Sequence, residues 1–179
     1  MAHALTSLRL LLVAPVAVAF AQPGFVGPGL LFVLVCVAIA TDYLDGQVAR
    51  KAGTASARGQ LFDHATDFIF VTTALVGAAM AGLLTPILPI VIIVAFAQYV
   101  LDSYFLYRQK QLRMSAIGRW NGILYFVPIV VLAVSRLGPF RDVEAFLTLT
   151  AGTMGYGLVA STVVSIVDRG VAPIHRRNL

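Results

Sequence analysis

Two apolar segments meet at a cluster of acids in residues 28–82, which read PGLLFVLVCVAIATDYLDGQVARKAGTASARGQLFDHATDFIFVTTALVGAAMAG. The acids of this stretch are Asp42, Asp45, Asp63 and Asp67, half of the eight acidic residues in the chain. Each apolar segment approaches the roughly 20 residues that a helix needs to cross a bilayer. Carboxylates near hydrocarbon are costly and usually functional, so the cluster indicates a site for polyvalent cations.

The composition of the whole chain places it in a membrane. Of its 179 residues, 59% are hydrophobic and 12% are charged, and the mean hydropathy is +0.89. This apolar content exceeds what one soluble core of that length can bury. The net charge is +5, but the basic residues lie in short links between apolar runs. They therefore indicate contact with anionic lipid headgroups and not with nucleic acid.

The pattern of apolar runs predicts an all-α integral membrane fold. We expect one bundle of six transmembrane helices that forms a single domain over residues 1–179. The spans are predicted at about 5–21, 28–49, 60–82, 86–107, 119–136 and 145–167. Turn-forming residues such as Pro23-Gly24 and Gly138-Pro139 separate them.

Basic residues predict the orientation of this bundle. Of the thirteen, only Arg136 and Arg141 fall on one side of the predicted spans. Both termini and the acidic cluster are therefore expected to face the cytoplasm, in a multi-pass protein of the inner (cytoplasmic) membrane. An alternative is that residues 1–21 form a secretory signal ending in Ala19-Phe20-Ala21. Removal of this signal would leave five spans, and one terminus would then lie on the wrong side of the charge asymmetry.

Helical spacing predicts that the four aspartates form one site. Asp42 and Asp45 stand one turn apart on one face, and Gly59, Asp63 and Asp67 form a row at i, i+4 and i+8. Two such rows facing each other bring the carboxylates together. Oxygen ligands of this kind suit Mg²⁺ or Mn²⁺, and a pair of such ions suits phosphoryl chemistry. His64 is expected roughly 100° away from the row, as a packing residue beside the site and not as a ligand.

Small and basic residues accompany the acids. Gly46, Ala49 and Gly59 remove bulk, either for close helix packing or for the approach of a flat ligand to the backbone. Taken alone, these small residues favour the helix-packing hypothesis. Taken together with the four aspartates, they favour the ligand-binding hypothesis. Arg50, at the membrane surface, is suited to pairing with a phosphate.

The whole pattern resembles the signature of the CDP-alcohol phosphotransferases, with no departure at any fixed position. The matching residues are Asp42, Asp45, Gly46, Ala49, Arg50, Gly59, Asp63 and Asp67. Leu5-Thr6-Ser7-Leu8-Arg9, followed by Pro15, is similar to the opening of the first helix in bacterial phospholipid-synthesising members. The N-terminus is shorter than in relatives that carry a juxtamembrane helix, which puts gating by such a helix in doubt.

The resemblance implies a reaction and its residues. In this family a CDP-linked lipid, usually CDP-diacylglycerol, gives its phosphatidyl group to the hydroxyl of a small polar alcohol, and CMP is released. The implied ligands of two divalent ions are Asp42, Asp45, Asp63 and Asp67. Asp67 is also the implied catalytic base. The implied lining of the cytidine and diphosphate pocket is Gly46, Ala49, Arg50 and Gly59. The family is commonly dimeric, so a homodimer is expected.

The acceptor alcohol is less well defined by the sequence. Four basic residues lie on the expected active-site side, namely Arg108, Lys110, Arg113 and Arg119. They favour a phosphorylated acceptor, glycerol 3-phosphate first and inositol phosphate next, or they serve only topology and lipid contact. Serine or an uncharged alcohol stays open. Asp102, an acid within a span, is either a site residue or a hydrogen-bonded strut.

Two other classes of protein are alternatives to an enzyme. A divalent-cation transporter also carries carboxylates within its spans, but here they lie near one membrane face, and no second copy of the motif follows. A noncatalytic membrane scaffold explains the small residues but not the aligned acids.

Overall fold

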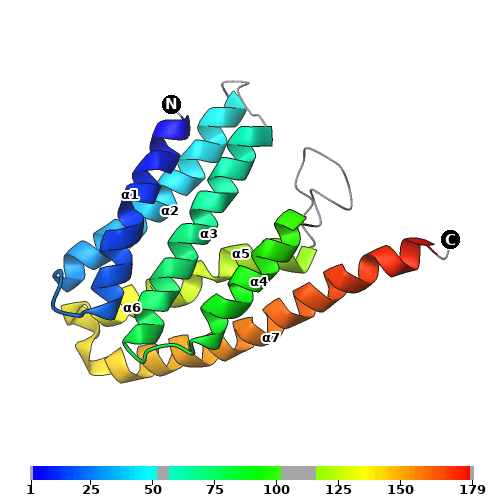
Figure 1. Cartoon of the computed structure of the whole chain (residues 1–179). Helices are drawn as coiled ribbons and strands as arrows, with labels where there is room; N and C mark the ends of the chain where they lie inside the picture. Colours follow the sequence, from blue (N-terminus) through cyan, green and yellow to red (C-terminus); the bar gives the residue numbers. More distant parts are fainter. Residues whose placement is uncertain (1, 52–56, 102–115, 178–179) are drawn as a thin grey trace.

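The computed structural model describes residues 2–51, 57–101 and 116–177, with side chains described except at 2–4, 45–46, 48–51, 57–58, 60 and 172–177. These residues are almost entirely helical, and no strand occurs among them, as predicted (Figure 1). The elements are α1 (Ala2–Ala21), α2 (Pro28–Lys51), α3 (Ala57–Met80), α4 (Ile87–Leu101), α5 (Ala116–Leu124), α6 (Phe126–Ser135), the 3₁₀ helix η2 (Gly138–Val143) and α7 (Glu144–Arg177).

The helices form two packed groups. In the first, α1 lies against both α2 and α3; in the second, α7 runs along α4, α5 and α6 (Figure 1). Contacts of α2 with α6 and of α3 with α4 join the groups. The shared core contains Phe20, Val35, Phe70, Leu75 and Ile129, all completely or almost completely buried. Burial of such side chains on several helices fixes their rotation about their own axes.

Helices α1 and α3 approach most closely at Gly77. A Cβ atom added to this glycine would lie 2.2 Å from the carbonyl oxygen of Ala17 and 3.0 Å from its carbonyl carbon. Gly77 therefore serves helix packing within the chain. The close approach keeps the two helices side by side along their length, and so places their residues nearer the opposite ends in contact.

The predicted span 119–136 corresponds to the apolar helical stretch Ala116–Ser135, which has a local irregularity at Tyr125. The chain leaves regular α-helix at Tyr125, between α5 and α6. Pro128 explains the break, because its ring crowds the carbonyl of Leu124 and it has no N–H to donate. At the break, the Tyr125 hydroxyl forms a 2.7 Å hydrogen bond with the hydroxyl of Thr162 on α7.

At the far end of α1, Arg136 provides the cap that the helix terminus needs. Its two terminal nitrogens donate hydrogen bonds to the carbonyl oxygens of Ala19 (2.7 Å) and Phe20 (3.1 Å). The guanidinium carbon also lies 5.4 Å from the centre of the Phe20 ring. Carbonyls of a last helical turn have no partner within their helix, so the arginine satisfies two of them.

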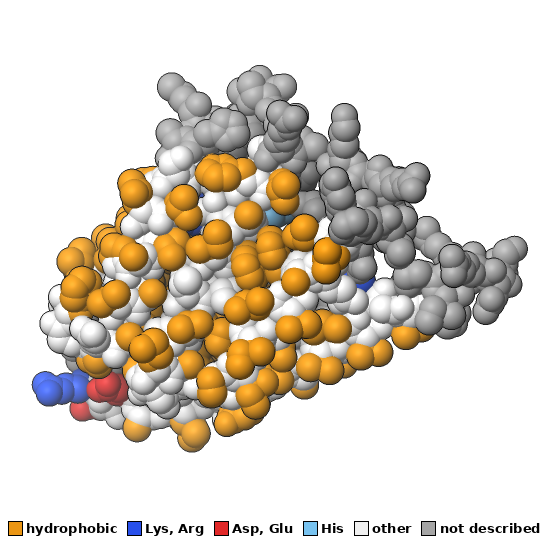
Figure 2. Space-filling model, in the orientation of Figure 1, with side chains coloured by type: hydrophobic (Ala, Val, Ile, Leu, Met, Phe, Trp, Pro, Cys, Tyr) orange, Lys and Arg blue, Asp and Glu red, His pale blue; other side chains and the backbone are white. Residues whose placement is uncertain are grey.

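The surface of the described part is strongly apolar. Large side chains such as Leu11, Met80 and Phe146 are each about 70% exposed. Figure 2 shows hydrophobic side chains over most of the described surface in that view, with basic and acidic side chains side by side at the lower left. Three stretches are long and apolar enough to cross a membrane: Leu61–Met80, Ala116–Ser135 and Gly138–Val171. The apolar stretches Leu5–Ala21, Pro28–Leu44 and Ile87–Leu101 are shorter. The number of spans and the side of the termini stay predictions.

Candidate active site

Aspartates from two helices meet beside a buried arginine. Asp42 lies on α2, and Asp63 and Asp67 lie one turn apart on α3. The Nη1 atom of Arg9, on α1, lies 3.2 Å from an oxygen of Asp42 and 3.4 Å from an oxygen of Asp63. The same nitrogen also pairs with an oxygen of Asp67. The convergence predicted for these three aspartates is therefore present, and Arg9 is at its centre.

Arg9 is a site residue that the sequence analysis missed. Its side chain is completely buried, whereas those of Asp42, Asp63 and Asp67 are 39%, 25% and 23% exposed. In the sequence, Arg9 contributed to the charge asymmetry and to the resemblance of residues 5–9 to a family helix, but no role at the site was predicted for it. The available signal was its position as a basic residue within an apolar run, since such charges normally pair with an opposite charge.

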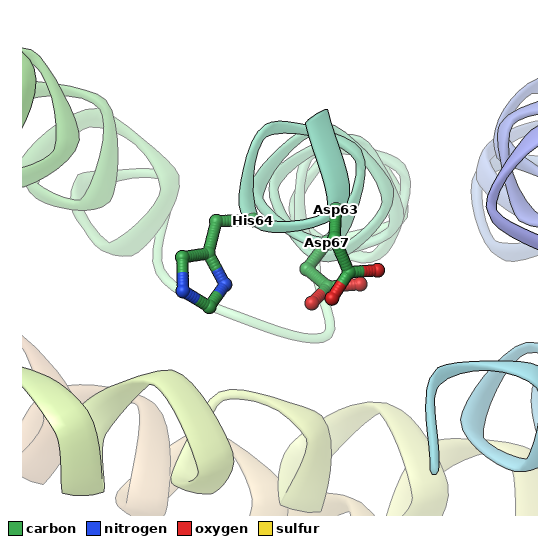
Figure 3. A group of neighbouring side chains, drawn as sticks. All are labelled: Asp63, His64 and Asp67. Atoms are coloured by element: carbon green, nitrogen blue, oxygen red, sulfur yellow. The ribbon is translucent and has the colours of Figure 1, made fainter. Parts of the chain in front are cut away.

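His64 lies nearer the aspartates than helical spacing predicted. One nitrogen of its ring and one oxygen each of Asp63 and Asp67 all lie within 4.8 Å of one another. Figure 3 shows the ring and the two carboxylates projecting to the same side of α3. The imidazole is long enough to reach back across the helix face. This nitrogen adds one more atom of a type that can coordinate a metal ion to the carboxylate oxygens.

The donor set fits a hard divalent cation. Oxygens of Asp42, Asp63 and Asp67 reach one common point, marked by the Arg9 nitrogen that contacts all of them. Several carboxylates around one small volume are what Mg²⁺ or Mn²⁺ requires. The partial exposure of the aspartates leaves them accessible to an ion and to a ligand.

Other predicted site residues fall partly or wholly outside the described part. Asp45, Gly46, Ala49 and Arg50 lie in the last turns of α2, but their side chains are not among those described. Gly59 lies half-buried in the first turn of α3. Four further residues lie outside the described residues altogether: Asp102, Arg108, Lys110 and Arg113.

A cavity of about 420 Å³ opens beside the aspartates. Asp42, His64 and Asp67 line it, and so do Arg119 on α5 and Arg169 on α7. Most of the remaining wall is apolar. The cavity thus combines acidic groups, basic groups and a hydrophobic surface in one enclosure.

Aromatic side chains form part of the cavity wall between the acidic and basic groups. Phe68 and Phe96 are stacked, with ring centres 4.0 Å apart and planes inclined by 6°. The Arg169 guanidinium lies over the Tyr99 ring, 5.1 Å from its centre. This contact holds a cationic group against the cavity wall. Arg169 follows the predicted last span, and the sequence analysis assigned it no role at the site.

Residues 1–167 match the family model of CDP-alcohol phosphatidyltransferase. The chain belongs to this family. The chain is also similar to a Mycoplasma genitalium protein named CDP-diacylglycerol–glycerol-3-phosphate 3-phosphatidyltransferase, with 35% identity over 105 residues. The match covers 57% of this chain and 42% of that relative, so the chain spans less than half the length of the relative it matches.

Family membership confirms the resemblance predicted from the signature. Members of this family are transferases that are generally dependent on divalent metals, so membership favours an enzyme over a transporter or a scaffold. Together with the apolar helices, membership also indicates a membrane protein. The roles of the individual site residues, the acceptor and the oligomeric state stay predictions.

Proposed function

We propose that this chain synthesises a membrane phospholipid by transferring a phosphatidyl group from CDP-diacylglycerol to a small polar alcohol, with release of CMP. The observation that carries the proposal is the meeting of Asp42, Asp63 and Asp67 at a cavity that also contains two arginines. The proposed ligands of two ions of Mg²⁺ or Mn²⁺ are Asp42, Asp45, Asp63 and Asp67. The proposed lining of the donor pocket is Gly46, Ala49, Arg50 and Gly59.

The proposed chemistry is an in-line displacement at the lipid phosphorus of the donor. The acceptor hydroxyl loses its proton to Asp67, and its oxygen forms a new bond to phosphorus. The bond between that phosphorus and the bridging oxygen of the diphosphate breaks, and CMP leaves with the electron pair. Divalent ions, when bound, offset the negative charge that develops on the CMP. The apolar wall of the cavity shields the reacting groups from bulk water.

A phosphorylated acceptor, glycerol 3-phosphate first and inositol phosphate next, fits the basic end of the cavity. Arg119 and Arg169 line the same cavity as Asp67, so two cationic side chains share the cavity with the proposed base. Arginine binds phosphate through charge-assisted, often bidentate, hydrogen bonds. The name of the Mycoplasma relative, a glycerol-3-phosphate phosphatidyltransferase, supports glycerol 3-phosphate as the first choice. Serine and uncharged alcohols are the alternatives within the family.

We further propose the arrangement in the membrane that the sequence predicts. Six spans place both termini and the active site at the cytoplasmic face of the inner membrane, and two copies form a homodimer. The diacyl tail of the donor then stays in the bilayer while its headgroup reacts at the surface. The distribution of basic residues supports this orientation.

The reaction is tested by supplying purified protein with CDP-diacylglycerol, Mg²⁺ or Mn²⁺, and a panel of alcohols. The panel contains glycerol 3-phosphate, inositol phosphate, inositol and serine, and the lipid product is identified by mass spectrometry. We expect metal-dependent release of CMP and a phosphorylated lipid product. Ion flux into proteoliposomes without release of CMP would instead establish the transporter.

The acceptor is tested by Arg119→Gln and Arg169→Gln, with Arg141→Gln as the matched control because Arg141 is exposed on η2 and does not line the cavity. Loss of one charge-assisted contact should lower kcat/KM for glycerol 3-phosphate by roughly tenfold or more. Donor binding and the control should change little. If both cavity variants keep wild-type acceptor kinetics, the phosphate-binding role of these arginines is wrong.

A further inference from the structure

Arg9 contacts three aspartates through a single atom. Nη1 lies 3.2 Å and 3.4 Å from oxygens of Asp42 and Asp63 and also pairs with Asp67. One nitrogen therefore occupies the point that oxygens from α2 and α3 share. A metal ion coordinated by the same three oxygens would compete with this nitrogen for them.

Arg9 places a positive charge at this point, and its side chain is completely buried. A buried charge of this kind is stable only with opposite charges beside it. The carboxylates equally need a cation, because several negative charges at this distance repel one another. Arg9 and divalent ions therefore both neutralise the negative charge of the same three carboxylates.

We propose that Arg9 is a tethered cation that competes with divalent ions for the carboxylate oxygens of Asp42, Asp63 and Asp67. An ion binding to these oxygens displaces the guanidinium from its central position. Arg9 then sets how strongly the site holds metal, and it keeps the carboxylates close together as ions exchange. The inference rests on the proposed role of the aspartates as metal ligands.

A purely structural Arg9 makes the opposite prediction for metal affinity. If the arginine only fastened α1 to α2 and α3, its loss would loosen the carboxylates and weaken metal binding. Competition predicts that the same loss strengthens metal binding, because a positive charge leaves the site and three oxygens are released. The direction of the change therefore separates the two roles.

The experiment measures Mn²⁺ binding to the purified full chain in detergent, with free Mn²⁺ followed by its electron paramagnetic resonance signal. Arg9→Gln should bind Mn²⁺ roughly tenfold or more tightly than wild type, since a unit charge a few ångströms away opposes the ion strongly. Arg9→Lys keeps the charge and should lie much closer to wild type. Arg136→Gln is the matched control, because it removes a charge that contacts the other end of α1.

Each result bears on the proposal. Mn²⁺ affinity in Arg9→Gln that equals or falls below wild type overturns competition, whereas absence of Mn²⁺ binding by wild type overturns the metal role of the aspartates instead. If Arg9→Gln does not fold alone, purification with Mn²⁺ should recover it, because the ions neutralise the same carboxylates. Arg9→Met is a second neutral variant. If Mn²⁺ recovers folded protein from neither Arg9→Gln nor Arg9→Met, that result also counts against competition.

Discussion

Replacing Gly77 by alanine should force α1 and α3 apart. The added carbon would lie 2.2 Å from the carbonyl oxygen of Ala17, where ordinary contact begins near 3.4 Å. The obstacle is backbone and cannot rotate away, so the helices must separate by roughly 1 Å. Overpacking of this kind costs about 3 kcal/mol, and the better helix propensity of alanine returns about 1 kcal/mol. We expect a net loss of about 2 kcal/mol.

The assay is thermal unfolding of purified variants in the same detergent, where this loss corresponds to a fall of roughly 4–8 °C in Tm for a chain of this size. Gly157→Ala is the matched control. Gly157 also lies within a helix, but an added Cβ would meet no atom within 4 Å. The control should be as stable as wild type or more so. Equal Tm values for the two variants would refute the close approach at Gly77.

Three further changes test the site and its support. Asp67→Asn keeps the shape of the side chain but removes the proton acceptor, so CMP release should fall by a factor on the order of 10² while CDP-lipid still binds; recovery of activity merely by raising the pH would argue against Asp67 as the base. Asp63→Ala should abolish turnover and weaken Mn²⁺ binding in a titration, and near-normal activity would contradict its role as a ligand. Arg136→Ala removes two hydrogen bonds and a ring contact at Phe20, and should cost roughly 2 kcal/mol, visible as a lower Tm with unchanged Mn²⁺ affinity.

Hydropathy and helical spacing predicted the features that lie within single elements. The apolar runs correctly located helices such as α1 and α4, because a long run of large apolar residues can be buried or placed in lipid only as regular structure. The spacing of Asp63 and Asp67 put them on one face of α3, as observed. Hydropathy did not indicate the irregularity at Tyr125, because an average over a whole span gives no weight to a single Pro128.

Features that depend on the rotation of one helix against another did not follow from the sequence. Arg9 reaches the aspartates only because α1 is turned so that this side chain faces α2 and α3. That rotation is fixed by packing, including the contact between Ala17 and Gly77. Arg169 was missed for a different reason: α7 continues well past the predicted end of its span and returns a basic residue to the cavity.

The length of α7 makes the enzyme sensitive to the thickness of its bilayer. At 1.5 Å per residue, its 34 residues extend for about 50 Å, whereas the hydrocarbon of a bilayer is about 30 Å thick. The helix must therefore tilt or project, and a thinner or thicker membrane changes its inclination. Because Arg169 sits on this helix and lines the cavity, a change of tilt moves a basic group relative to Asp67. In the proposed reaction the product is itself a membrane lipid, so its accumulation is expected to change the tilt of α7 and with it the geometry of the site.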